Sequence, residues 1–158
     1  MNRPIHIPRS GYAALRKGSI SLEGNIYLVT FATSRRIRLF DDPEFARVAS
    51  HAICDARLWQ SAKLLTWVLM PDHWHGLVEL GATGTLPATV QKLKSNTARR
   101  IRLENPKVGV VWEKGFHDRA VRADESVLHL ARYIVLNPIR AKVVRRVSDY
   151  PYWNAVWL

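Results

Sequence analysis

Two histidines separated by a single residue stand at the head of an apolar segment, within the sequence MPDHWHGLVEL. Side chains two residues apart point to the same face of an extended strand, so His73 and His75 would aim their imidazoles in one direction, with Trp74 turned into the core. Two neutral imidazoles on a rigid strand make half of a divalent metal site. The alternative is that one or both histidines cap a strand end near water, so the residues farther along the chain bear on the choice.

A tyrosine and an asparagine downstream have the spacing of neighbours on a helix. Tyr133 and Asn137 are four residues apart, so they would lie on one helical face, and His129 extends the same stripe by another turn. Taken singly, a helical tyrosine is usually a residue at the edge of a core, and an asparagine before Pro138 usually marks a helix end. Together with two imidazoles, an amide oxygen would hold a divalent ion that keeps open positions for phosphate oxygens. The tyrosine could then attack phosphorus and form a covalent phosphotyrosyl intermediate.

The sequence around these residues predicts an α+β fold. Apolar, β-branched runs indicate strands, and apolar residues at helical spacing indicate helices, the first of them capped by Asp41 or Asp42. We expect strands over residues 25–33, 63–70, 73–80, 108–113 and 116–121, and helices over residues 43–60, 86–104 and 125–137. The two short strands around Lys114-Gly115 would form a hairpin. This order is that of a ferredoxin-like, split βαβ antiparallel sheet with its helices on one face.

The chain carries 24 Lys and Arg residues against 13 Asp and Glu residues, a net charge of +11. Such an excess on a folded domain favours a polyanionic partner, because each neutralised phosphate releases condensed counterions, and nucleic acid is the first expectation. No apolar run approaches the ~20 residues of a membrane span, and no apolar stretch resembles a signal peptide. The single cysteine, Cys54, excludes an internal disulfide and a thiolate zinc cluster. We therefore expect a cytoplasmic protein with no membrane partner.

Two segments of the chain resemble one known family. MPDHWHGLVEL is similar to the HUH motif (His, bulky hydrophobe, His) of single-tyrosine transposases, and VWEKGFHDRAVRADESVLHLARYIVLNPIRAKVV is similar to the C-terminal part of the same family. The resemblance runs over residues 26–144. Within the family the sequence is most similar to the REP-associated tyrosine transposases, which are bacterial, chromosomally encoded and linked to repetitive extragenic palindromes. The shared segments are LRKG…NIYLVTF and YIVLNPIRA.

The resemblance implies a role for each of four residues. His73, His75 and Asn137 would be ligands of Mg²⁺ or Mn²⁺, and Tyr133 would be the nucleophile. The reaction would be cleavage of single-stranded DNA next to hairpins, such as those of palindromic repeats, leaving a 5′-phosphotyrosine and a free 3′-OH. The resemblance would place the protein at the bacterial nucleoid. Relatives build the site within one chain or share it between two, so a monomer and a homodimer both stay open.

The expected organisation is a single domain over residues 1–158, with a basic N-terminal arm (1–23), a catalytic core (24–144) and an aromatic C-terminal tail (145–158). The tail could cover an exposed edge strand or fold over the active site. Single strands are bound by cationic grooves and aromatic stacking, so basic residues of the arm, of the loop after the first strand and of the second helix are the candidate DNA contacts. These are Arg9, Arg16, Lys17, Arg35, Arg36, Arg38, Lys92, Lys94 and Arg99.

Three functions stay open for this sequence. The first is a metal-dependent enzyme that nicks and joins DNA through the tyrosine. The second is a hairpin-binding protein on the same fold that does not cut, and the third is a metal-dependent hydrolase without covalent catalysis. Only the first needs His73, His75, Tyr133 and Asn137 to converge, and only the third would keep its activity when Tyr133 is replaced by Phe.

Overall fold

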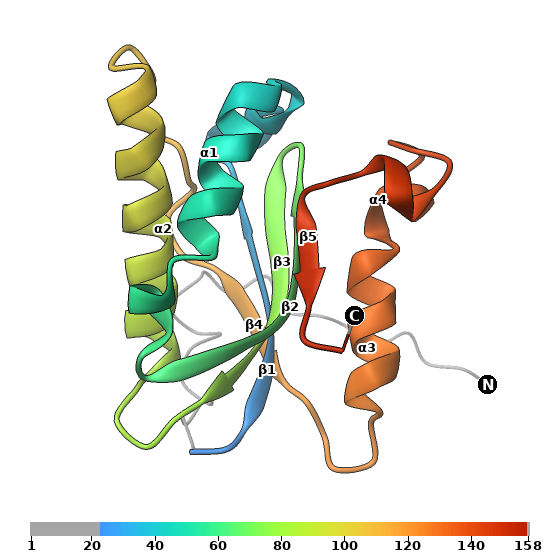
Figure 1. Cartoon of the computed structure of the whole chain (residues 1–158). Helices are drawn as coiled ribbons and strands as arrows, with labels where there is room; N and C mark the ends of the chain where they lie inside the picture. The colour runs from blue at the N-terminus through green and yellow to red at the C-terminus, as the bar shows by residue number, and fades with distance from the viewer. Residues whose placement is uncertain (1–22, 158) are drawn as a thin grey trace, which may run out of the picture.

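The computed structural model describes residues 23–157. Five antiparallel strands form one sheet in the order β4-β1-β3-β2-β5 (Figure 1). The strands are β1 (Ile26–Ala32), β2 (Ala62–Met70), β3 (His73–Leu80), β4 (His117–Ala120) and β5 (Trp153–Ala155). The helices are α1 (Pro43–Ile53), α2 (Leu86–Glu104), α3 (Val127–Val135) and α4 (Asn137–Arg140), with short 3₁₀ segments η1 (Ser34–Arg36), η2 (Leu39–Asp41), η3 (Ala56–Trp59) and η4 (Val147–Asp149).

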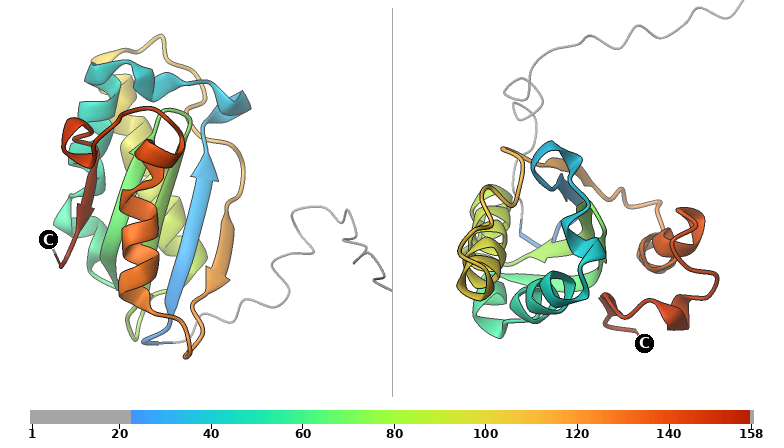
Figure 2. Two further views of the ribbon diagram at one scale, coloured as in Figure 1. Left: turned by 90° about the vertical axis from the view of Figure 1, so that its right-hand side faces the viewer. Right: turned by 90° about the horizontal axis from the view of Figure 1, so that it is seen from above.

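Helices cover both faces of this sheet. In Figure 1 and in the view from above in Figure 2, α1 and α2 lie on one side of the strands and α3 with α4 lies on the other. The antiparallel α+β fold is confirmed, but the expectation that all helices share one face is wrong. The reason is the run from Leu65 to Met70 in β2, in which every residue is buried. Because successive side chains point to opposite faces, both faces of this strand are apolar and both need cover.

The first helix begins where the sequence predicts but ends earlier. Asp42 is its N-cap, with its side chain accepting a hydrogen bond from the Glu44 backbone N–H at 2.9 Å, and Pro43 is in the first turn. The helix ends at Ile53 rather than near residue 60. Asp55 then caps η3 by accepting a hydrogen bond from the Arg57 backbone N–H, so a new turn starts there.

The hairpin expected around residues 108–121 does not form. Only β4 is a strand, and it pairs with β1 at one edge of the sheet, whereas Trp112 makes an isolated bridge to Thr33. The Trp112 ring is buried against Phe31, with ring centroids 4.8 Å apart, and its indole N–H donates to the Thr97 hydroxyl at 2.8 Å. Burial of this aromatic ring on the α2 side therefore takes the segment out of the sheet.

The C-terminal tail covers an edge of the sheet, the first of the two positions expected for it. β5 pairs with β2, and the buried Tyr150 hydroxyl donates to the Leu69 backbone oxygen at 2.6 Å. Both outer strands, β4 and β5, are short, which limits pairing of an exposed edge with another chain. Over the described part of the chain, no helix is long and apolar enough to cross a membrane.

Candidate active site

The two histidines lie on the face of β3 that α3 covers. His73 pairs with Ala32 and Met70 across the sheet, and His75 pairs with Thr30 and Val68. Met70, Val68 and Leu77 form one apolar cluster with Ala131 and Ile134 of α3. Since residues two apart on β3 share a face, the histidines belong to the same face as Leu77. The predicted shared direction of the two imidazoles is therefore confirmed.

The residues between and after the histidines hold the strand in place from the opposite face. Trp74 is fully buried and stacks on Phe31, with ring centroids 5.0 Å apart. A Cβ atom added to Gly76 would lie 2.4 Å from Cη2 of Trp74 and 2.9 Å from the Thr66 backbone oxygen. Glycine is needed at this position because the indole ring occupies the space next to the strand.

Asp72 orients the first imidazole. Its carboxylate lies 2.7 Å from Nδ1 of His73 and 3.5 Å from the Arg36 guanidinium. Partial burial acts against the charged carboxylate, but the His73 hydrogen bond and the neighbouring charges hold the pKa of Asp72 below its usual value. The carboxylate is suited to accept a hydrogen bond from Nδ1–H of His73, which leaves the lone pair of Nε2 free. Sequence reasoning missed this role, although an acidic residue directly before the motif was a visible signal.

The second imidazole is half-buried and neutral. Burial is the main cause that lowers the pKa of His75 to about 4, and the electrostatic influence of His73 and of the Arg140 guanidinium adds to it. Its Nε2 atom is buried and has no hydrogen-bond partner among the described residues. A buried polar atom without a partner is costly unless a ligand satisfies it, and a neutral imidazole nitrogen is a common metal ligand. His75 therefore fits a metal ligand better than a strand cap near water.

Tyr133 lies on α3, near the end of the helix. Ser126 caps this helix by accepting a hydrogen bond from the His129 backbone N–H at 3.2 Å. Ile134 is fully buried against the sheet, whereas the Tyr133 side chain is 49% exposed and His129 is exposed. The nucleophile candidate is thus accessible, while the helix that carries it is fixed by apolar packing on the face that bears the histidines.

The helix is interrupted between Tyr133 and Asn137. α3 ends at Val135, Leu136 has φ −82° and ψ 0°, and Asn137 begins α4. The single helix expected over residues 125–137 is therefore two, because Pro138 lacks a backbone N–H and disturbs the helical hydrogen bonds of the turn before it. Asn137 is half-buried. α4 contacts β2, the neighbour of the histidine strand.

Arg140, on α4, interacts with both Tyr133 and His75. Its guanidinium carbon lies 3.6 Å from the centre of the Tyr133 ring, and its Nη1 atom donates to the Tyr133 backbone oxygen at 2.6 Å. The charge of the same guanidinium also disfavours protonation of His75. Arg140 is therefore within electrostatic reach of the His75 imidazole while it contacts the tyrosine. The sequence alone gives no reason to single out this arginine, because its contact with Tyr133 depends on the interrupted helix.

The candidate donor set for a metal would consist of two imidazoles and one amide. Across residues 23–157, no three His, Cys, Asp or Glu side chains gather in a way that could hold a metal ion. A third protein ligand would therefore have to be of another type, and the Asn137 amide oxygen suits Mg²⁺ or Mn²⁺. The unpartnered Nε2 of His75 and the Asp72-oriented His73 fit such an ion.

The candidate DNA contacts fall on two sides of the molecule. The loop with Arg35, Arg36 and Arg38 follows β1, whose last residue pairs with His73, so this loop borders the histidines. Arg35 and Arg36 have φ of 55° and 56°, in the left-handed region, and such strain is concentrated at functional sites. The candidates of the basic arm, Arg9, Arg16 and Lys17, lie outside the described residues.

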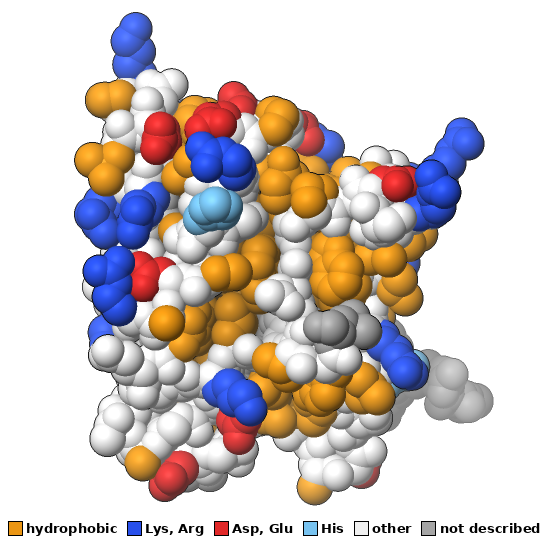
Figure 3. Space-filling model, viewed as in Figure 1, with side chains coloured by type: hydrophobic (Ala, Val, Ile, Leu, Met, Phe, Trp, Pro, Cys, Tyr) orange, Lys and Arg blue, Asp and Glu red, His pale blue; other side chains and the backbone are white. Residues whose placement is uncertain are grey.

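The basic residues of α2 do not converge with the histidines. Lys92, Lys94 and Arg99 are on the helix that covers the opposite face of the sheet. Lys94 donates to the backbone oxygens of Glu113 and Gly115 at 2.6 and 2.7 Å, so its ammonium group is already engaged by this chain. Figure 3 shows Lys and Arg side chains on the α2 side with Asp and Glu side chains between them, rather than one continuous basic surface.

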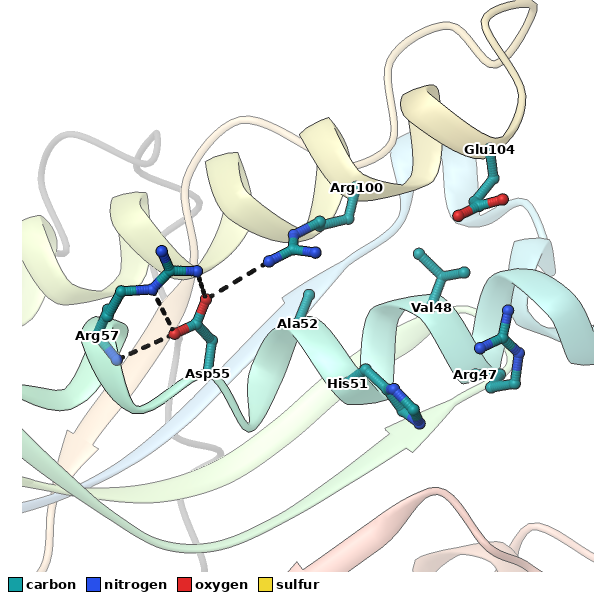
Figure 4. Close-up of a pocket in the computed structure, with 8 residues that line it drawn as sticks. All are labelled: Arg47, Val48, His51, Ala52, Asp55, Arg57, Arg100 and Glu104. Atoms are coloured by element: carbon teal, nitrogen blue, oxygen red, sulfur yellow. Dashed lines mark hydrogen bonds and ion pairs between the residues drawn. The ribbon is translucent and has the colours of Figure 1, made fainter.

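A charged pocket between α1 and α2 lies away from the histidines. In Figure 4, Asp55 is between Arg57 and Arg100, at 2.7 and 3.7 Å. These two contacts lower the pKa of Asp55 to about 2, chiefly through the Arg57 hydrogen bond. The charges of this pocket therefore largely compensate one another, and the pocket adds nothing to the metal and tyrosine site.

Known proteins match both the sequence and the fold. Over 103 residues, the chain is 25% identical to the "REP-associated tyrosine transposase" of Escherichia coli K12, a match that covers 65% of this chain and 59% of that protein. The chain thus spans somewhat over half the length of this curated relative. A solved structure of a REP-associated tyrosine transposase bound to a REP hairpin matches with a TM-score of 0.69 and 20% identity, over 85% of this chain and 79% of that one.

A second solved structure supports the same fold. It is a candidate transposase of Deinococcus radiodurans R1, with a TM-score of 0.50, 18% identity, and coverage of 85% of this chain and 94% of that one. The sequence model described as "Transposase IS200 like" matches residues 22–137, which is most of the chain and includes both histidines, the tyrosine and the asparagine. The resemblance predicted from the two motifs is confirmed: the chain belongs to the IS200-like transposase family.

Proposed function

We propose that this protein is a metal-dependent enzyme that nicks and joins single-stranded DNA at hairpins, with Tyr133 as its nucleophile. The observation that carries the proposal is the placement of α3 over the histidine-bearing face of β3. An accessible tyrosine thereby lies on the helix that covers the two imidazoles. Membership of a transposase family agrees with DNA cleavage as the reaction class.

The roles of the site residues follow from their surroundings. His73, His75 and Asn137 would hold Mg²⁺ or Mn²⁺, which when bound supplies Lewis-acid polarisation of the scissile phosphate. Asp72 keeps the His73 ring in one orientation and tautomer through the 2.7 Å contact to Nδ1. Burial keeps His75 neutral, so that its nitrogen lone pair is available over the physiological pH range.

The covalent step exchanges one phosphate ester for another. The Tyr133 phenol oxygen forms a bond to phosphorus, the bond from phosphorus to the 3′ oxygen breaks, the phenol loses its proton and the 3′ oxygen takes one up. The phosphodiester energy is retained in the phosphotyrosine. A 3′-OH can therefore attack the phosphotyrosine in the reverse direction, which rejoins DNA without ATP.

The basic loop next to the histidines is the best-placed contact for the DNA backbone. Arg36 bridges to Asp72, and Arg35 and Arg38 lie on either side of it at the surface. The net charge of +11 supports a nucleic-acid partner. Hairpin DNA is proposed as the substrate because a structurally similar protein was solved with a REP hairpin. Residues 1–23 are proposed as a further basic contact.

The test is a cleavage assay with wild type and Tyr133→Phe on single-stranded oligonucleotides that carry REP-like hairpins. We expect a protein–DNA adduct on denaturing gels that requires Mn²⁺ or Mg²⁺ and is absent from Tyr133→Phe. Tyr152→Phe, which removes a phenol hydroxyl from the C-terminal tail, is the matched control and should form the adduct at the wild-type rate.

Two other results would each contradict the proposal and identify a different function. Metal-dependent cleavage that survives in Tyr133→Phe would identify a hydrolase that uses water as its nucleophile. Tight and hairpin-specific binding without cleavage of any substrate would identify a binding protein on a transposase fold.

A further inference from the structure

One arginine makes two different contacts with the proposed nucleophile. The guanidinium carbon of Arg140 lies 3.6 Å from the centre of the Tyr133 ring, and Nη1 donates to the Tyr133 backbone oxygen at 2.6 Å. The first contact restrains the face of the phenol ring, and the second ties the arginine to the helix turn from which the phenol projects. Arg140 thus contacts both the side chain and the backbone of one residue.

The break between α3 and α4 allows Arg140 to contact Tyr133 in both ways. The last carbonyl groups of a helix lack partners within the helix, and the Tyr133 carbonyl is one of them because α3 ends at Val135. Arg140 follows on α4, where the backbone N–H of Arg140 bonds to the Leu136 oxygen at 3.1 Å. Its side chain can therefore fold back along the chain and satisfy the Tyr133 carbonyl.

The restraint matters because Tyr133 is otherwise weakly held. Its side chain is 49% exposed, and an exposed side chain exchanges between staggered rotamers. Covalent catalysis requires the attacking atom in line with the reacting centre, and misplacement by ~1 Å can lower a rate about 100-fold. A planar guanidinium on the ring face limits the range of phenol orientations without covering the hydroxyl edge.

We propose that Arg140 is a positioning residue, which holds the Tyr133 phenol for attack on the DNA and keeps a positive charge next to the phosphodiester. This inference rests on the proposed function. As the phenol oxygen bonds to phosphorus and the 3′ oxygen leaves, negative charge is shared by the phosphate oxygens. A fixed cation beside the phenol opposes that charge in both the forward and the rejoining step. Lysine would keep the charge but lose the planar stack on the ring.

The first experiment measures single-turnover adduct formation by wild type, Arg140→Lys and Arg140→Ala, with Arg145→Ala as the control. Arg145 is an exposed arginine of the same C-terminal segment. We expect Arg140→Ala to be slower by about 10- to 100-fold, Arg140→Lys to recover part of the rate, and Arg145→Ala to match wild type. Hairpin affinity at fixed salt and the melting temperature should stay close to the wild-type values in all four proteins.

Three results would overturn the inference. An affinity loss as large as the rate loss would make Arg140 a DNA anchor. A rate loss that follows a fall in melting temperature would make it a purely structural residue. Faster adduct formation in Arg140→Ala would mean that the stack holds the phenol in an unreactive position.

The second experiment needs neither DNA nor metal. Acetylation of tyrosines by N-acetylimidazole is followed by mass spectrometry, with Tyr133 compared with the half-buried Tyr152 as an internal reference. We expect the Tyr133 rate to rise several-fold in Arg140→Ala and less in Arg140→Lys, with Tyr152 unchanged. Equal Tyr133 rates in all variants would overturn the inference even if the wild type cleaves DNA. Absence of an adduct in the wild type would instead contradict the proposed function, and the acetylation rates would still decide whether Arg140 holds the phenol.

Discussion

Arg140 and Tyr133 form a contact that spans the break between α3 and α4, with the guanidinium carbon 3.6 Å from the ring centre. The charge of Arg140 also reaches His75, where it adds to burial in lowering the pKa of the imidazole. One side chain thereby links the proposed nucleophile to the proposed metal ligands. The proposed tyrosine chemistry would therefore lie near the end of the sheet where β2 turns into β3.

Metal binding should stabilise the folded protein through His75. Its buried Nε2 has no partner among the described residues, so an ion that satisfies it binds the folded chain and not the unfolded one. We expect Mn²⁺ at about 100 times its dissociation constant to add ~2.7 kcal/mol to the free energy of unfolding. His75→Ala should lose this gain, and the exposed His129→Ala should keep it. Denaturant titrations with and without Mn²⁺ measure the effect, and an equal gain in His75→Ala would contradict the assignment.

Replacement of Asp72 by Asn should weaken metal binding without removing a ligand. The Asp72 carboxylate fixes the His73 ring at 2.7 Å, and loss of such an outer contact typically lowers metal affinity ~10- to 100-fold. Isothermal titration with Mn²⁺ is the measurement. Asp41→Asn is the control, because Asp41 instead contacts Arg38 at 2.6 Å. Wild-type affinity in Asp72→Asn would mean that the contact does not orient the ligand.

Gly76→Ala should destabilise the strand that carries the histidines. The added methyl group would lie 2.4 Å from the Trp74 ring. Because the surrounding side chains must shift to accommodate it, we expect such overpacking to lower the free energy of unfolding by about 1–3 kcal/mol. Chemical denaturation should give a lower free energy of unfolding, and the loss should be smaller when Trp74→Phe is already present. Gly109→Ala is the control, since a Cβ atom there meets nothing within 4 Å. Additive losses in the double variant would place the clash elsewhere.

Tyr150→Phe should loosen the tail from the sheet. Its hydroxyl donates to the Leu69 backbone oxygen at 2.6 Å in a buried setting, and loss of the donor leaves that oxygen with one partner fewer. We expect a decrease of about 1–3 kcal/mol in the free energy of unfolding. Tyr152→Phe should cost less, because Tyr152 is only half-buried. Equal decreases in the free energy of unfolding of the two variants would show that the hydrogen bond from Tyr150 to Leu69 does not stabilise the tail.

Tyr150 should also affect how the stability of the protein depends on pH in the alkaline range. Burial raises the pKa of Tyr150 above its ordinary value, so the folded protein keeps this proton where the unfolded chain loses it. The stabilising contribution is complete below about pH 10, the unperturbed tyrosine pKa, and falls as the pH rises further. The free energy of unfolding should therefore decline less steeply above that pH in Tyr150→Phe than in wild type. Parallel pH curves for the two proteins would contradict the shift.

Local sequence patterns determined much of the site. The alternation along β3 predicted that His73 and His75 share a face and that Trp74 is buried, because strand geometry fixes side-chain direction over two residues. The bounds of α2 and the Asp42 cap were equally local, since helical spacing and a capping oxygen act within one or two turns. The family relationship also followed from two motifs alone.

Tertiary structure decided the features that depend on contacts between distant segments. Which face α3 covers depends on Ile134 meeting the apolar second face of β2, and the edge that β5 covers depends on Tyr150 reaching Leu69. The contact between Arg140 and Tyr133 arises because the chain bends at Pro138. These placements depend on packing and on buried hydrogen bonds between distant segments. The pattern of residues within a single segment carries no information about such contacts.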